Sequence, residues 1–279
     1  MIPFNFIYCR PDTLKEAADI YSSLAAEGKI PLYYGGGSEI ISMSRAGAIR
    51  PDAVIDIKNI PECRVLSKDD EYLYIGSACT LSQISESNLF PLMRLAGGRI
   101  ADHTNQCRIT LGGNLCGTII YRETSLPLML SEAQIIFFGP KGKRVAPFRN
   151  VFHGRLERCP DEFVMRVQIP LWALIARHAH QKKSANEKID YPLVTVAALW
   201  KGSKLRTAFS GVCSHPFRST EIETVLNDHR KPCAVRAEEA AGLLPEPPYS
   251  DPEGSGEYRL FVFKNSLKTL LEEWENGSI

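Results

Sequence analysis

Three consecutive glycines that directly follow a predicted strand constrain this chain more than any other feature of its sequence. Residues 30–34 form a short extended segment, and Gly35-Gly36-Gly37-Ser38 comes next. Glycines at the end of a strand let backbone amides approach a phosphate without interference from a Cβ atom. The same pattern also occurs in ordinary tight turns. The segment therefore predicts a strand, a turn and a helix, with a phosphate site as one of two interpretations of the turn.

A second glycine loop repeats this chemistry. Thr110-Leu111-Gly112-Gly113-Asn114 places paired glycines between a hydroxyl and an amide. Neither loop has the G-x-G-x-x-G or the G-x-x-x-x-G-K-[ST] spacing of the well-known nucleotide motifs. Two such loops would still supply many amide donors to the adjacent phosphates of a dinucleotide. A site built from backbone donors also agrees with a formal net charge of only +1.

The composition excludes several classes of partner. Lys and Arg number 33 and Asp and Glu number 32, so no overall field attracts nucleic acid or an anionic membrane. Apolar runs such as residues 192–200 are far shorter than the roughly 20 residues of a membrane helix. The N-terminal residues 1–6 lack the layout of a signal peptide. We expect a cytoplasmic protein of 279 residues with one large domain or two modest ones.

The cysteines and histidines predict neither a metal site nor a catalytic group. The eight cysteines have no pair at the spacing of zinc or iron–sulfur ligands, so we interpret them as mostly buried free thiols. The six histidines form no nucleophile or metal motif.

The pattern of elements mixes helices and strands. Thr13 is expected to cap a helix with Glu16 reaching back toward the cap, and Gly28 to end that helix. The remaining expectations are strands at 54–57, 72–76, 134–138, 163–170, 194–200 and 205–212, helices from 81 and at 88–105, 127–132, 220–226 and 258–274, and loops at 106–118 and 244–256. A change of character near residue 170 predicts a domain boundary there.

The combination of three segments resembles a known family. Tyr33-Tyr34-Gly35-Gly36-Gly37-Ser38-Glu39-Ile40 is followed by Ile75-Gly76-Ser77-Ala78-Cys79-Thr80 and by the second glycine loop. This order is similar to the FAD-binding medium subunit of the molybdenum hydroxylases, the xanthine dehydrogenase and carbon monoxide dehydrogenase family. The resemblance covers nearly the whole chain. It implies an α+β fold: a two-part FAD-binding domain of the vanillyl-alcohol oxidase (PCMH) type at 1–170 and a smaller α+β C-terminal domain at 171–279.

The resemblance also implies which residues bind the cofactor. The segments from Tyr33 to Ile40 and from Thr110 to Asn114 would be the pyrophosphate and ribityl loops. Glu123 stands where the family usually has an aspartate that hydrogen-bonds FAD, although it could be a surface acid in the first turn of the following helix. Lys182 matches a lysine near the flavin edge, where a cation would stabilise a reduced, anionic flavin, with Lys183 as the alternative if the register slips.

Two features leave parts of that assignment open. Lys182 and Lys183 could equally form a solvated charged turn. Gln106 and Ile109 replace the family's usual Arg and Gly before the second loop, so the contacts around residues 103–109 stay open. Tyr33 and Tyr34 alternate along a strand, so one of them is expected to pack in the core while the other meets the cofactor.

The function that the resemblance implies is a relay of electrons. Electrons would leave a substrate at a molybdopterin-binding large subunit, pass through the 2Fe-2S clusters of a small subunit, and reach FAD on this chain. NAD or another acceptor would then receive them, and the substrate would be a purine or related N-heterocycle. The assembly would be a heterotrimer, and this chain would need no catalytic side chain of its own. The alternatives are a stand-alone flavin oxidase and a scaffold subunit that has lost FAD.

Overall fold

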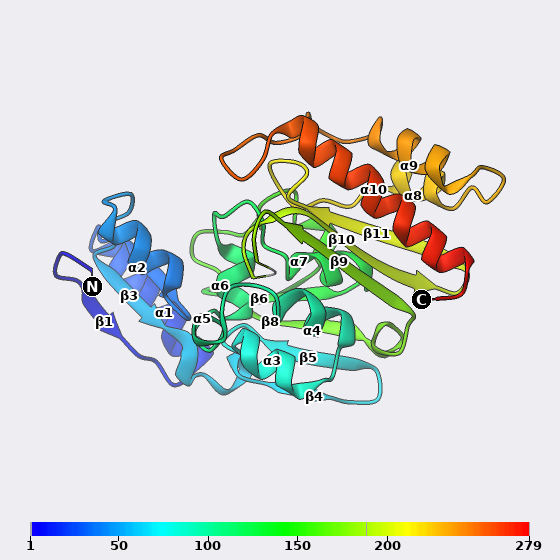
Figure 1. Cartoon of the computed structure of the whole chain (residues 1–279). Helices are drawn as coiled ribbons and strands as arrows, with labels where there is room; N and C mark the ends of the chain where they lie inside the picture. The colour runs from blue at the N-terminus through cyan, green and yellow to red at the C-terminus, as the bar shows by residue number, and fades with distance from the viewer. Residues whose placement is uncertain (1, 188, 279) are drawn as a thin grey trace. The chain divides into compact units, whose positions relative to one another are not determined.

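The chain folds into two compact units of mixed helix and sheet. A computed structural model describes residues 2–187 and 189–278. Unit 1 comprises residues 1–87, 103–117 and 132–171, and unit 2 comprises residues 88–102, 118–131 and 172–279. Figure 1 labels most helices and strands of both units. The domain boundary near residue 170 stays a prediction. Unit 2 takes the chain from residue 172 onward together with two earlier segments.

A parallel three-stranded sheet of order β1-β3-β2 lies in unit 1. Its strands are β1 (Ile7–Cys9), β3 (Ala53–Asp56) and β2 (Pro31–Tyr34). Helix α1 (Leu14–Ala26) precedes β2, and its cap is as predicted, because the Thr13 hydroxyl accepts a hydrogen bond from the Glu16 amide at 3.2 Å. Neighbouring parallel strands end at one edge of a sheet. The first glycine loop therefore begins beside the end of β3.

A five-stranded antiparallel sheet of order β4-β5-β8-β6-β7 completes unit 1. Its strands are β4 (Leu66–Lys68), β5 (Tyr72–Gly76), β8 (Phe163–Pro170), β6 (Gln134–Gly139) and β7 (Gly142–Pro147). Ile55 of β3, Ile136 of β6 and Phe163 of β8 belong to one buried cluster, so the two sheets of this unit share a core. The unit's other helices are α2 (Ser38–Arg45), α3 (Leu81–Ser87), α5 (His103–Gln106) and α6 (Leu111–Cys116).

Unit 2 is built around an antiparallel sheet of order β11-β10-β9. The strands are β9 (His178–Ser184), β10 (Pro192–Lys201) and β11 (Lys204–Ser210). Helices α8 (Thr220–Leu226), α9 (Cys233–Ala241) and α10 (Gly256–Glu275) bury apolar side chains against β10 and β11 in a second core (Figure 1). Helices α4 (Pro91–Gly97) and α7 (Ser125–Leu130) also pack on the strands of this sheet.

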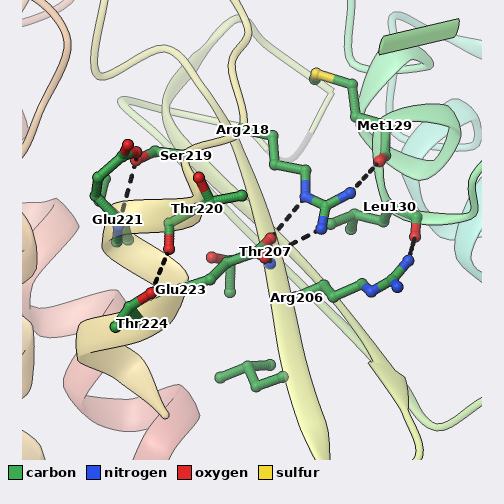
Figure 2. Close-up of polar contacts among 12 residues, drawn as sticks. Met129, Leu130, Arg206, Thr207, Arg218, Ser219, Thr220, Glu221, Glu223 and Thr224 are labelled. Atoms are coloured by element: carbon green, nitrogen blue, oxygen red, sulfur yellow. Dashed lines mark hydrogen bonds and ion pairs between the residues drawn. The ribbon is translucent and has the colours of Figure 1, made fainter. Parts of the chain in front are cut away.

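Buried charge ties helix α8 and helix α7 to strand β11. Arg218 donates two hydrogen bonds to Glu223, at 2.7 and 3.0 Å, and a third to the Met129 carbonyl (Figure 2). Glu223 in turn accepts from the backbone amide of Thr207 at 3.0 Å. Arg206 donates to the Leu130 carbonyl at 3.1 Å. A bidentate Arg–Glu pair fixes orientation as well as distance, so this cluster locks the C-terminal end of α7 against the sheet.

The structure corrects two of the predicted elements. Residues 88–105 are not one helix, because α4 ends at Gly97 and α5 starts only at His103. Between them Ala101 has a φ of +54°, which a continuous helix does not allow. Residues 106–118 are not only a loop, because α6 begins after Thr110, whose hydroxyl caps the Gly113 amide at 3.2 Å. The predicted strands at 72–76 and 163–170 and the helix at 220–226 are confirmed.

Candidate functional site

The two glycine loops meet inside unit 1, although more than 70 residues of sequence separate them. A Cβ atom on Gly36 would lie 1.7 Å from the carbonyl oxygen of Arg108, and one on Gly35 would lie 2.7 Å from the Thr110 Oγ1. Real Cβ atoms do not approach backbone oxygens so closely. The first loop therefore needs glycine in order to pack against the segment that leads into the second.

The third motif segment joins the same place. The Gly112 amide donates to the Ser77 carbonyl at 2.8 Å, and a Cβ on Gly112 would lie 2.7 Å from the Ser77 Cβ. Thr80 and Thr110 form an isolated antiparallel bridge. The three segments that carry the family resemblance are thus brought together by backbone contacts in one unit.

Gly113 differs from the other loop glycines. It is exposed, and the one neighbour that a Cβ there would meet is the Thr110 Oγ1, at 3.0 Å. The packing of the described residues therefore makes little demand for glycine at this position. An open glycine beside tightly packed ones is the feature expected where a ligand approaches the backbone.

The first turn of α2 offers backbone donors beside this opening. Gly37 is the N-cap of the helix, has a φ of +73° and makes no side-chain cap. The backbone amides of Gly36, Gly37 and Ser38 donate to no acceptor among the described residues. Unpaired amides at a helix start favour a negatively charged group. Glu39 lies on the same turn, with its Oε2 2.5 Å from where a Cβ on Gly117 would be.

The two tyrosines before the loop have different surroundings. Tyr33 stacks on Tyr21 with ring centroids 5.1 Å apart and donates its hydroxyl to the Asp161 carbonyl, so it packs with the core of unit 1. The Tyr34 ring lies under the Lys58 ammonium, 4.6 Å from the centroid. Burial, and then the charge of Asp56, raises the pKa of Tyr34. Tyr34 and not Tyr33 is the tyrosine at the loop.

Lys58 is a residue at the loop that the sequence analysis missed. Its ammonium donates to the Gly35 carbonyl at 2.9 Å and to the Asp56 carboxylate at 2.7 Å. Although burial acts in the opposite direction, the hydrogen bonds from Lys58 and Tyr8 lower the pKa of Asp56. The order of the strands could have indicated it. Lys58 follows β3, and parallel strands place the residues after their carboxyl ends at a common edge of the sheet, so Lys58 is expected near the loop that follows β2.

Glu123 and Lys182 are brought together in unit 2. The Lys182 ammonium donates to Glu123 at 3.0 Å and to the Arg99 carbonyl at 2.7 Å, and the Thr195 hydroxyl donates to the other Glu123 oxygen at 2.8 Å. Their side chains are 1% and 3% exposed. Neither alternative holds: Glu123 is not a surface acid, and Lys182 lies on strand β9 rather than in a solvated turn. Lys183, the alternative to Lys182, is exposed.

The surroundings of this pair are buried and positively charged. Burial raises the pKa of Glu123, while the Lys182 charge and the Thr195 hydroxyl act in the opposite direction. His180 lies two residues before Lys182 on β9, and both of its ring nitrogens are buried without a hydrogen-bond partner among the described residues. Burial, then the charges of Arg99 and Lys182, lowers the pKa of His180 to about 3. The imidazole is therefore neutral at physiological pH.

The comparison with protein families decides the identity of the fold. The family described as the FAD binding domain in molybdopterin dehydrogenase matches residues 3–172 of this chain. The match spans both glycine loops and the segment between them.

The chain belongs to this family. FAD is its cofactor, and the α+β fold predicted from the sequence is confirmed. The carbon monoxide dehydrogenase medium chain of Hydrogenophaga pseudoflava is 26% identical over 190 residues, which cover 65% of this chain and 64% of that protein. The caffeine dehydrogenase subunit beta of Pseudomonas sp. (strain CBB1) is 29% identical over 223 residues, covering 71% of this chain and 75% of that protein.

A solved structure agrees on the fold of this FAD-binding family member. Quinoline 2-oxidoreductase from Pseudomonas putida 86 contains a chain that superimposes with a TM-score of 0.84 at 22% identity, covering 98% of each chain. The donor set of unit 1 fits the cofactor. Unpaired amides at Gly36 to Ser38 and the open surface at Gly113 suit a pyrophosphate, which requires donors and close backbone approach rather than net charge.

Other expectations have mixed outcomes. All eight cysteines are free, but only Cys63, Cys79 and Cys213 are buried, while Cys107, Cys116 and Cys159 are exposed. The interpretation as mostly buried thiols is therefore wrong. No group of three metal-ligating side chains occurs within residues 2–187 and 189–278. None of the helices in the described parts of the chain is long and apolar enough to cross a membrane.

Proposed function

We propose that this FAD-binding chain is the electron-transfer subunit of a molybdenum hydroxylase. In this role it receives electrons from the 2Fe-2S clusters of a small subunit and delivers them to NAD or another acceptor. A molybdopterin-binding large subunit oxidises the substrate, a purine or related N-heterocycle, in a xanthine dehydrogenase-like heterotrimer. FAD supplies the chemistry of this relay, because a flavin exchanges single electrons and releases a pair as hydride.

The observation that supports this role most is the meeting of the two glycine loops in unit 1. Gly35 and Gly36 pack against Thr110 and Arg108, while Gly113 stays open. We infer that the amides from Gly36 to Ser38 and the loop from Thr110 to Asn114 hold the pyrophosphate. The segment 1–170 would then be the FAD-binding domain, and 171–279 the C-terminal domain of the flavoprotein.

The remaining site residues have narrower roles in the proposal. Tyr34 and Lys58 line the first loop, and Glu39 and Ile40 continue it into α2. The family resemblance assigns Glu123 to a hydrogen bond with FAD and Lys182 to the flavin edge. Within unit 2 the Thr195 hydroxyl and the Arg99 carbonyl fix the positions of these two side chains. Because the carboxylate and the ammonium are buried and hydrogen-bond each other, both charged groups keep fixed positions.

The names of the relatives support the proposal of partners. One relative is named a medium chain and another a subunit beta, and both names indicate proteins with further subunits. The relatives differ in the substrate that their names state, so the purine or N-heterocycle rests on the family resemblance alone.

The experiment uses the assembled enzyme. The chain is co-expressed with a molybdopterin-binding large subunit and a 2Fe-2S small subunit, and the complex is purified and titrated anaerobically with xanthine and with quinoline. Bleaching of the flavin absorbance, followed by its recovery when NAD is added, is the expected result. If the chain purifies alone with FAD and is reduced directly by a substrate, the stand-alone oxidase replaces the relay.

A further inference from the structure

All three tryptophans of the chain line one cavity in unit 2. Trp172 lies just after β8, Trp200 near the end of β10 and Trp274 in the last turn of α10. The cavity has a volume of about 690 Å³, within the range of small-molecule sites. Figure 1 shows the last turn of α10 close to the C-terminal end of the chain. The relay described above uses none of these residues.

The wall of the cavity is aromatic. The Trp200 and Trp274 rings meet edge to face with centroids 5.6 Å apart, and the His229 ring lies 4.8 Å from Trp274. Ile175, which is 90% exposed, is another lining residue. A surface of this kind stabilises a flat apolar ring, because indole faces and edges offer large contact areas with little loss of side-chain entropy.

Arg177 places hydrogen-bond donors in the lining of the cavity. The Arg177 guanidinium lies 5.2 Å from the centroid of Trp200 and makes one hydrogen bond, to the Trp274 carbonyl at 3.5 Å. No carboxylate pairs with it among the described residues. Trp200 is 4% exposed, and its buried indole Nε1 has no acceptor within the described chain. Because this N–H is closed to solvent, the exposed Arg177 guanidinium is the donor that a ligand in the cavity reaches.

The one carboxylate in the lining is already paired. Glu275 forms an ion pair with Arg236, whose side chain is 1% exposed, and accepts a hydrogen bond from the Cys233 thiol at 3.2 Å. Lys201 adds a second cation, 4.9 Å from the Trp172 ring centroid. Arg177 and Lys201 are cations and Glu275 is the one carboxylate in the lining that the structure describes, so these side chains together carry a net positive charge.

We propose that this cavity binds a planar aromatic anion. The ring of the ligand packs on the indole wall, and its anionic group accepts hydrogen bonds from the Arg177 guanidinium. Fused-ring carboxylates are the ligand class with both features. A neutral ring lacks the charge, and an aliphatic acid lacks the stacking surface.

The tryptophans themselves supply the measurement. The full chain, loaded with FAD and labelled with ¹⁵N-tryptophan, has three indole N–H signals, which Trp→Phe variants assign. Titration with 2-naphthoate is expected to shift the Trp200 signal saturably, whereas 2-naphthylmethylammonium and cyclohexanecarboxylate leave it in place. Arg177→Gln is expected to weaken 2-naphthoate at least tenfold, since a charged hydrogen bond contributes about 1.5 kcal/mol or more.

The control variant is Lys268→Gln, which removes one positive charge from α10 outside the cavity lining and is expected to change the affinity less than twofold. Arg177 is exposed, so its replacement leaves the core of unit 2 intact. The absence of any shift at millimolar 2-naphthoate would overturn the proposal. So would equal binding of the ammonium analogue, or an unchanged affinity in Arg177→Gln.

Discussion

The glycine loops of unit 1 and the Glu123–Lys182 pair of unit 2 are both assigned to FAD, yet they are built in opposite ways. The loops contribute backbone groups, with an open surface at Gly113 and amides that no described residue accepts from. The pair contributes charged side chains that are 1% and 3% exposed and already satisfy each other. In the proposed role the loops find their partners on the cofactor, whereas the pair already has its partners within the fold of unit 2. Substitutions in the open part of the loops are therefore expected to change FAD retention, and substitutions in the pair are expected to change the unfolding free energy.

The largest expected effect comes from breaking the buried pair. Lys182→Met leaves the Glu123 carboxylate buried without its counter-ion, and the loss of one partner of such a pair costs about 3 to 5 kcal/mol of unfolding free energy. Urea denaturation of the FAD-free chain, followed by circular dichroism, measures it. Lys183→Met is the matched control on the next residue of β9 and is expected to cost less than about 0.5 kcal/mol, because Lys183 is exposed. Equal losses in the two variants would show that the pair does not stabilise unit 2.

A smaller effect is expected where the loops pack. Gly36→Ala places a methyl group 1.7 Å from the Arg108 carbonyl, so the loops must separate at a cost of about 1 to 3 kcal/mol, with FAD lost as well. Gly242→Ala is the control, because its φ is −72° and its Cβ would meet the nearest atom at 3.4 Å. The unfolding midpoint and the flavin content are measured together. A Gly36→Ala chain as stable and as yellow as the control would contradict the packing described for the loops.

The pH dependence of stability tests the surroundings of the pair. Because burial lowers the pKa of His180 to about 3, the folded state binds fewer protons than the unfolded state below pH 6.5. Stability is therefore not reduced by His180 above pH 6.5. As the pH falls from 6.5 toward 3, protonation of the unfolded state lowers the unfolding free energy, by about 1.4 kcal/mol at pH 5.5. His180→Leu should flatten the stability curve between pH 7 and 5.5. An unchanged slope would mean that His180 is solvated.

Much of unit 1 could be predicted from local signals. The Thr13 cap, the strand at 72–76 and the glycine turn after β2 each depend on neighbouring residues, and the structure has them. Helix α6 could not be predicted from local signals, because Gly112 and Gly113 disfavour a helix. It is stabilised by the Thr110 side-chain cap and by the hydrogen bond from the Gly112 amide to the Ser77 carbonyl.

The candidate site was predicted in kind but not in detail. The sequence predicts either a tight turn or room for a phosphate at the glycines. In the structure Gly36 and Gly112 make room for Arg108 and Ser77, and Gly113 is the open one among the described glycines of the two loops. Lys58 was missed because its place at the loop depends on the pairing of β2 with β3. The burial of Lys182 was open for the same reason, because it depends on β9 pairing with β10.

The most direct test of the account is the flavin content of Gly113→Val. A Cβ atom here meets one side-chain oxygen of the described chain, at 3.0 Å, so the smallest stability change of the series is expected, below about 1 kcal/mol. The absorption spectrum of the purified variant, and chromatography of the compound released by heat, measure the bound FAD. A folded, colourless chain with the unfolding midpoint of the FAD-free parent is expected. A folded variant with a full complement of FAD would contradict the assignment of the cofactor to the glycine loops.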